Sequence, residues 1–259
     1  MSLAEVRKFT YRPEIPLVVL PSEYYPRGSS SPSSTETTHK RGDDPIPPEN
    51  HARIQLDRSI GIVNYLYQIT FGHNKTPLQT ATDIARRNGI VDLLDVGCGT
   101  GNTVRTWGMS VAKAAALDIE NVSMTGVSLY DYRNESSYPA TLGAHRDGTV
   151  RYIVGDAANM KDIDDASKDV VLANASLIYS EDPVAWMEEM LRVTKPGGVL
   201  YFDLSEDQNI SNTPIMEFLF EKADHGHVFD NMPVNIYSQN SQPERHITKT
   251  FCRLEKPVN

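Results

Sequence analysis

Short apolar runs alternate with helical stretches between residues 91 and 204 of the chain. Each run has the length of a strand, and the alternation predicts a parallel sheet with helices on both of its faces. The predicted strands are Leu93–Val96, Ala114–Ile119, Val150–Val154, Val170–Ala173 and Val199–Leu204. The clearest helix precedes the last of them, since Asp182 is a suitable N-cap, Pro183 lies in the first turn, and apolar residues recur on one side from Val184 to Leu191.

Further elements are predicted on both sides of this region. An apolar stripe at helical spacing indicates a helix within His51–Phe71, and a shorter helix fits Leu78–Arg87. After residue 204 the pattern predicts a helix over Thr213–Ala223 and an antiparallel hairpin of Asn235–Ser238 and Ile247–Leu254. The expected fold is a doubly wound α/β sheet of about seven strands, mostly parallel, with a C-terminal antiparallel hairpin.

The first fifty residues have a different composition. They contain half of the sixteen prolines, and Gly28–Thr38 is a tract of Ser, Thr, Gly, Glu and Pro with nothing to bury. Residues 1–50 are therefore predicted to be largely disordered or loosely attached. The apolar patch Ile15–Leu20 is the exception, and it suits either a strand or a segment that docks on a protein partner.

Composition excludes several classes of protein. The 259 residues are 39% hydrophobic, and no apolar run approaches the roughly 18 residues that cross a bilayer. No signal peptide is visible at Met1, so a cytoplasmic location is expected. Two cysteines, Cys98 and Cys252, give neither a disulfide framework nor a metal site. Residues 51–259 carry 19 basic and 27 acidic side chains, and this excess of negative charge disfavours nucleic acid as a partner.

A glycine-rich turn follows the first predicted strand of the alternating region. It reads Asp95-Val-Gly97-Cys-Gly99-Thr-Gly101-Asn102, and glycines at such a place let the backbone approach a ligand at the start of a helix. The G-x-G-x-x-G spacing of nicotinamide dinucleotide sites fails, because Asn102 stands where the third glycine is required. Asp95 lies two residues before the first glycine, where a carboxylate would repel a pyrophosphate and attract a cationic group.

With this turn, the sequence resembles the class I S-adenosylmethionine-dependent methyltransferases over about residues 92–204. Four further segments carry the resemblance in the right order: Ala116–Glu120, Tyr152–Ala157, Val171–Pro183 and Val193–Leu200. The resemblance implies a Rossmann-like fold, S-adenosyl-L-methionine as cofactor, and a methyltransferase domain over residues 51–259. In that domain residues 51–90 are expected to be a helical cap, 91–204 the cofactor-binding core, and 205–259 the final helix and hairpin.

The resemblance also implies roles for individual residues. Gly97, Gly99 and Gly101 would line the methionine moiety with Asp95 near its ammonium group, and Cys98 would fill space among them. Asp118, followed by Ile119, would end the second strand and hold the ribose, with Glu120 as a substitute. Asp156 and Ala157 would contact the adenine, and Asn174 would face the reacting methyl group.

Catalysis of methyl transfer needs mainly an acceptor held in line with the S–CH₃ bond, and a general base only when the acceptor is protonated. Many relatives that act on small molecules have paired histidines where this chain has Ile178-Tyr179, so a histidine base is not expected there. The candidate catalytic residues are Tyr179, which could equally be core packing, and His73. His225 and His227 are weaker candidates near the acceptor.

The favoured function is transfer of a methyl group to an O, N or C centre of a small-molecule acceptor. One alternative is a non-catalytic, cofactor-binding subunit with a protein partner, contacted through residues 1–50. Others are a protein methyltransferase and a nicotinamide-dependent dehydrogenase, and the position of Asn102 argues against the last.

Overall fold

A computed structural model describes residues 17–19, 69–71, 74–99, 101–129, 131, 149–174, 176–177, 180–205, 213–238 and 245–258. They form an eight-stranded sheet in the order β1-β7-β8-β6-β5-β2-β3-β4. The strands are β1 (Leu17–Val19), β2 (Val91–Val96), β3 (Val122–Ser128), β4 (Arg151–Val154), β5 (Lys168–Ala173), β6 (Thr194–Ser205), β7 (Val228–Ser238) and β8 (Arg245–Glu255). Strands β2 to β6 pair in parallel, and β8 pairs antiparallel with both β6 and β7. The predicted α/β sheet, mostly parallel with a C-terminal antiparallel hairpin, is confirmed.

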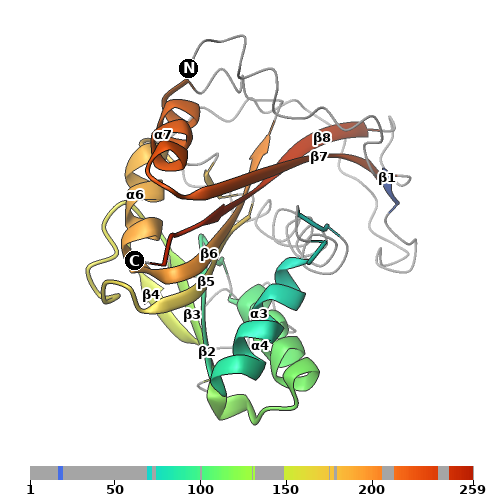
Figure 1. Cartoon of the computed structure of the whole chain (residues 1–259), viewed down its shortest axis with the longest axis vertical. Helices are drawn as coiled ribbons and strands as arrows, with labels where there is room; N and C mark the ends of the chain where they lie inside the picture. The colour runs from blue at the N-terminus through green and yellow to red at the C-terminus, as the bar shows by residue number, and fades with distance from the viewer. Residues whose placement is uncertain are drawn as a thin grey trace.

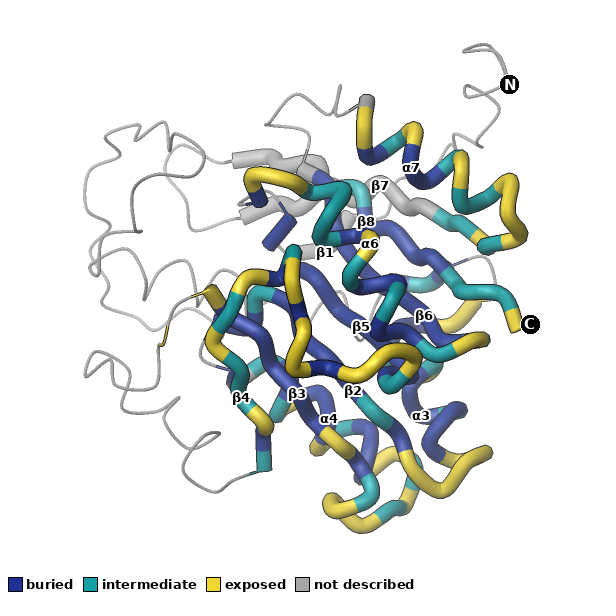
Figure 2. Tube along the Cα trace, turned by 90° about the vertical axis from the view of Figure 1, so that its left-hand side faces the viewer, coloured by how far each residue is buried: buried dark blue, intermediate teal, exposed yellow. Residues whose placement is uncertain are grey.

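Helices cover both faces of the sheet (Figure 1). Helices α3 (Pro77–Asn88) and α4 (Asn102–Ala115) pack on one face, and α6 (Pro183–Val193) and α7 (Thr213–Asp224) on the other. The first face is filled around Trp107 and the second around Met187 and Phe202, all fully buried. Figure 2 shows β2, β3, β5 and β6 as the buried centre of the molecule. None of the helices in the described residues is both long enough and apolar enough to cross a membrane.

Local signals account for the helix ends. Thr76 and Gln79 form a capping box at the start of α3, with Pro77 in its first turn, and Gly89 ends the helix with φ 75°. Asp182 caps α6 by accepting a hydrogen bond from the backbone N–H of Ala185. The predictions for α3, α6 and α7 are confirmed, whereas most of the predicted helix over 51–71 lies outside the described residues.

One predicted strand is wrong. Residues Ala114 and Ala115 are the last turn of α4, and Leu117 closes it with a backbone hydrogen bond to the Ala112 carbonyl. Alanine is the strongest helix former, so the apolar run extends the helix instead of starting a strand. The strand begins later, at Val122, after a 3₁₀ turn that we label η2 (Ile119–Asn121).

The described part of the N-terminal segment completes the sheet. Leu17–Val19 pairs in parallel with Asn235–Tyr237 of β7. The strand alternative for the apolar patch is therefore confirmed for these three residues, and the prediction of disorder for the rest of residues 1–50 lies outside the described residues.

Candidate functional site

The chain reverses its direction of winding at β2, which lies between β3 and β5 in the sheet. In doubly wound sheets, ligands bind at such a switch point, outside the carboxyl ends of the strands. We call this side of the sheet the carboxyl edge and the opposite side the amino edge. The glycine-rich turn after β2 lies on the carboxyl edge.

Alternate glycines shape this turn. Gly97, Gly99 and Gly101 have φ values of 71°, 56° and 76°. An L side chain in this left-handed region costs roughly 1–2 kcal/mol. The turn ends where α4 begins, so the first backbone N–H groups of that helix face the carboxyl edge.

Neighbouring strands hold the turn in place. The backbone N–H of Cys98 donates to the Val127 carbonyl at 2.8 Å, and the hydroxyl of Tyr152 donates to the Gly99 carbonyl at 2.7 Å. The Cys98 side chain is buried against Gly126, where a Cβ would lie 2.6 Å from Cys98 Sγ. Cys98 therefore fills the space between the turn and β3.

Asp95 lies in the middle of the sheet, two residues before the turn. It is in register with Gly126 of β3 and Leu172 of β5, and its side chain is fully buried. Alternation with Leu93 places it on the face that packs against α3 and α4. Its negative charge would attract a cationic ligand group at this point.

Three buried side-chain oxygens gather where β5 ends. Asn174, Ser176 and Ser180 are 1%, 3% and 2% exposed. Asn174 Oδ1 and the two serine Oγ atoms have no hydrogen-bond partner among the described residues. Leu172 is in register with Asp95, so Asn174 follows β5 on the same edge of the sheet on which Gly97 follows β2. A polar ligand on this edge would satisfy groups that otherwise each cost about 1–3 kcal/mol.

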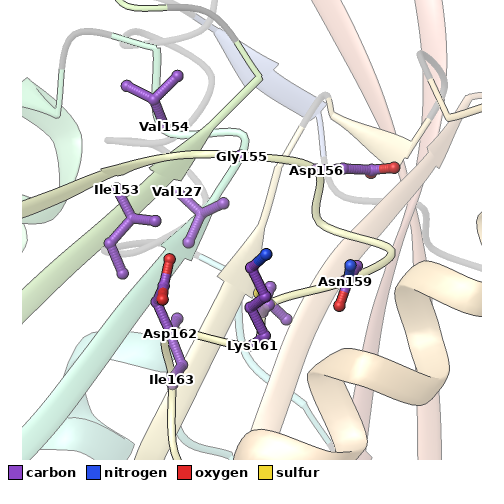
Figure 3. Close-up of a pocket in the computed structure, with 10 residues that line it drawn as sticks. Val127, Ile153, Val154, Gly155, Asp156, Asn159, Lys161, Asp162 and Ile163 are labelled. Carbon is purple, nitrogen blue, oxygen red and sulfur yellow. The ribbon is translucent and has the colours of Figure 1, made fainter.

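A cavity of about 230 Å³ lies at the carboxyl ends of β3 and β4 (Figure 3). Val127 and Ile153 line its strand side, and the loop after β4 lines the other side. Asp156 is exposed at the start of this loop, and its Oδ1 accepts a hydrogen bond from the Ala158 backbone N–H at 2.9 Å. Ala157 is buried. Since pockets for drug-sized ligands measure roughly 300–1,000 Å³, this cavity suits one ring system of a larger ligand.

Asp118 and Ile119 do not lie on the carboxyl edge. They precede Val122, which is in register with Val91 at the start of β2. The six residues of β2, at roughly 3.3 Å each, separate them from Gly97. The prediction that Asp118 ends the second strand is wrong, because that segment ends a helix, and neither residue can reach a ligand at the glycine turn.

The true end of β3 supplies different side chains. Ser128 is buried there and its carbonyl accepts a hydrogen bond from the Gly155 N–H at 2.9 Å, while Asp131 is exposed three residues later. The sequence analysis missed both residues. The run Val122–Val127, with three β-branched residues, was the signal that could have found them.

His225 and His227 lie on the amino edge, so their predicted place near an acceptor is wrong. They follow α7, where Nδ1 of each ring is 2.7 Å from the Glu221 carbonyl and 3.0 Å from the Lys222 carbonyl, respectively. These contacts occupy the last carbonyl groups of the helix. Burial lowers the pKa of His227, which favours its neutral ring.

Tyr179 and His73, the two predicted catalytic residues, lie outside the described residues, as do Ala175 and Ile178. The residues on either side of Tyr179 are described in part. The Ser180 N–H donates to the Leu177 carbonyl at 3.1 Å, and both side chains are buried at the carboxyl edge. The catalytic roles of Tyr179 and His73 stay predictions.

Comparison with known proteins adds independent information. Residues 94–202 match the model of a family described as a methyltransferase domain. This match begins in β2 and ends in β6, so it contains the glycine turn, the cavity and the buried oxygens.

Curated relatives differ in the atom that their names specify. A malonyl-[acyl-carrier protein] O-methyltransferase of Yersinia pestis is 24% identical over 60% of this chain and 51% of its own. A thiol S-methyltransferase of Mus musculus is 28% identical over 46% of this chain and 45% of its own. A sterol 24-C-methyltransferase of Aspergillus fumigatus is 31% identical over 45% of this chain and 29% of its own. The chain thus spans about half of the length of the O-methyltransferase that it matches.

Among solved structures, a methyltransferase from Aquifex aeolicus is similar with a TM-score of 0.48 and 14% identity, over 81% of this chain and 99% of its own.

Proposed function

We propose that the chain, whose residues 94–202 match a methyltransferase-domain family, is a class I S-adenosylmethionine-dependent methyltransferase that transfers a methyl group to a small-molecule acceptor. The observation that carries the proposal is the set of buried oxygens of Asn174, Ser176 and Ser180, which have no hydrogen-bond partner in the described part of the chain and lie on the edge that carries the glycine turn. These groups lower stability unless a polar ligand binds them.

Several residues of the carboxyl edge fit the donor. Gly97, Gly99 and Gly101 leave room along the turn for the methionine moiety, and the buried Asp95 carboxylate would attract its ammonium group. Asp156 and Ala157, at the cavity beside β4, would contact the adenine. Ser128 and Asp131 replace Asp118 and Ile119 as the candidates for the ribose hydroxyls.

The bound sulfonium supplies an electrophilic methyl group, so the protein contributes mainly by orienting the acceptor. Asn174 lies between the donor and acceptor sides, and the serine hydroxyls can donate to an acceptor oxygen or accept from its hydroxyl or amine. Tyr179 belongs to the same segment and is the proposed orienting group, with His73 as a second. A general base is required only for an acceptor that is protonated at the working pH.

Calorimetric titration with S-adenosylmethionine and S-adenosylhomocysteine tests the donor site. Asn174→Leu removes the polar group at similar volume, and the lost hydrogen bond to a charged ligand should weaken binding about ten- to a hundredfold. Asp118→Ala is the matched control, because Asp118 lies on the amino edge and its loss should leave affinity unchanged. Equal effects of the two substitutions, or no binding by the wild type, would overturn the proposal.

Transfer of a labelled methyl group to a panel of hydroxyl, carboxyl, amine, thiol and activated-carbon compounds tests the reaction. Turnover of at least one class is expected, and the relatives' names justify including oxygen, sulfur and carbon acceptors. Tight donor binding without turnover would instead favour a non-catalytic subunit with a protein partner. Removal of residues 1–50 would then show whether that partner binds through them.

A further inference from the structure

The wall of the cavity at β3 and β4 is a loop without secondary structure of its own. Residues 155–167 join β4 to β5, and within them Asn159, Met160, Lys161, Asp162 and Ile163 line the cavity. In Figure 3 this loop runs from Asp156 past Asn159 to Asp162 and Ile163. Two local hydrogen bonds, from the Asn159 N–H to the Asp156 carbonyl and from the Ile163 N–H to the Met160 carbonyl, make two separate turns of it. The second turn, Met160–Ile163, lines the cavity and is held by side chains from outside the loop.

Arg192, in the last turn of α6, holds both ends of the second turn. Its Nη2 donates to the Met160 carbonyl at 2.9 Å, and its Nη1 donates to the Ile163 carbonyl at 3.0 Å. The same guanidinium contacts the carboxylate of Asp165, where the loop approaches β5. One planar side chain therefore spans the loop from residue 160 to residue 165.

Glu189, one turn earlier on α6, completes the arrangement. Its carboxylate accepts hydrogen bonds from Arg192 Nε at 2.7 Å and Nη2 at 2.8 Å, which fixes the plane of the guanidinium. Glu189 Oε2 also accepts the Met160 backbone N–H at 2.7 Å. Both backbone polar groups of Met160, a cavity-lining residue, are thus held by α6 side chains.

These contacts are stronger than ordinary surface pairs. The side chains of Arg192 and Glu189 are only 29% and 20% exposed. The hydrogen bond from Arg192 lowers the pKa of Glu189, and that from Glu189 raises the pKa of Arg192, so both stay ionised. A lysine cannot replace the fork, since an ammonium group lacks its planar, fixed donors.

We propose that Arg192 and Glu189 are positioning residues that set the shape of the nucleobase cavity, and so determine the affinity for the adenosine end of the methyl donor. The proposal rests on the proposed function, because it assigns this cavity to the donor. Neither side chain is among the residues that line the cavity. Their effect passes through the backbone of Met160 and Ile163.

The test compares Arg192→Lys with a control on the same helix end. Lys256 Nζ donates to the Leu191 and Thr194 carbonyls, both at 2.8 Å, so Lys256→Met removes two hydrogen bonds at the end of α6 and leaves every hydrogen bond of Arg192 and Glu189 to the loop in place. Thermal unfolding reports stability, and calorimetry reports the affinity for S-adenosylhomocysteine, 5′-methylthioadenosine and S-inosylhomocysteine. The inosine analogue differs from the first ligand only in the base.

We expect Arg192→Lys to weaken binding of both adenosine ligands about tenfold and to reduce the preference for the adenine over the inosine base. Lys256→Met should lower the unfolding temperature and leave the ligand affinities and the preference for adenine over inosine within twofold of wild type. Glu189→Gln should give a smaller loss of affinity for the adenosine ligands, and it tests the proposal if Arg192→Lys does not fold.

Two results would overturn the proposal, and they are distinguishable. If the wild type binds none of the three ligands, the proposed function fails and this inference fails with it. If the wild type binds them but both Arg192→Lys and Glu189→Gln keep the affinities and the base preference within twofold, or change them only as Lys256→Met does, this inference alone is wrong.

Discussion

Gly126 in β3 packs against the Cys98 side chain of the glycine turn. A Cβ at this position would lie 2.6 Å from Cys98 Sγ, 3.0 Å from Cys98 Cβ and 3.8 Å from Val104 Cγ1. Comfortable contacts between such atoms are roughly 3.5–4.0 Å, so Gly126→Ala forces about 1 Å of overlap. Cys98 cannot retreat freely, because its backbone N–H is bonded to the next residue of β3, Val127.

We expect Gly126→Ala to destabilise the protein by about 1–3 kcal/mol, the usual cost of overpacking a buried site. For a chain of this size each kcal/mol lowers Tm by about 2–4 °C. The displaced turn should also weaken S-adenosylhomocysteine binding about tenfold, which corresponds to about 1.4 kcal/mol.

Cys98→Ala in the same chain should rescue both effects. It removes the sulfur at 2.6 Å and leaves only the Cβ contact at 3.0 Å, which needs a shift of a few tenths of an ångström. A double-mutant cycle of the two positions, with thermal unfolding and calorimetry on all four proteins, measures the coupling. A favourable coupling of at least about 1 kcal/mol is expected, and a value within about 0.5 kcal/mol of zero would refute the contact.

Three further predictions follow from the described residues. Gly97→Ala and Gly89→Ala introduce a side chain at nearly equal φ, 71° and 75°, so similar losses of Tm are expected. Only Gly97→Ala should weaken donor binding in calorimetry, and equal affinities of the two variants would contradict a donor site at the glycine turn. Ser180→Ala removes a buried hydroxyl without a described partner, so it should raise Tm of the free protein while lowering acceptor turnover, and a lower Tm would show that the hydroxyl is already satisfied. Glu189 has a lowered pKa because Arg192 donates to it. Its contribution to stability is full above the unfolded pKa of about 4.3 and is lost as the pH falls through the lower folded pKa. The Tm of Glu189→Gln should therefore fall less on acidification than that of wild type, and an equal fall would exclude this ion pair as the cause.

Most of the fold could be predicted because its signals are local. Pro183 after Asp182, and Gly89 after α3, mark helix ends by their own backbone chemistry. The strand before the glycine turn and the final hairpin were found for the same reason. The length of the hairpin strands was underestimated, since β7 and β8 each extend over 11 residues and gain their pairing from β6 and from each other.

The ribose candidate could not be found in the same way. The run from Ala114 to Ile119 is apolar and ends near an acid, which satisfies a strand pattern as well as a helix end. Tertiary packing decides between them, because Leu117 packs on the core around Trp107, whereas Val122 pairs with Val91 in the sheet. An error of a few residues in the position of the strand thus placed the predicted ribose-binding residue on the wrong edge of the sheet.

The two edges of the sheet differ in how their polar groups are satisfied. On the amino edge, Lys195 Nζ donates to Asp92 at 2.8 Å and to Asp169 at 2.9 Å, and the buried Lys168 donates to a threonine hydroxyl of β3 at 2.9 Å. Burial lowers the pKa of Lys168, and its amine makes a hydrogen bond within the protein. On the carboxyl edge, the oxygens of the Asn174–Ser180 segment are buried with no described partner.

An unmade hydrogen bond in the interior lowers stability, so several such groups close together favour the binding of a polar molecule that completes them. The charged side chains Lys195 and Lys168 of the amino edge have their partners within the described part of the chain. The carboxyl edge gains from each polar contact that a donor or an acceptor makes, and it also has the glycine turn that admits them. This asymmetry favours the carboxyl edge as the site, and it agrees with the edge that the methyltransferase resemblance selects.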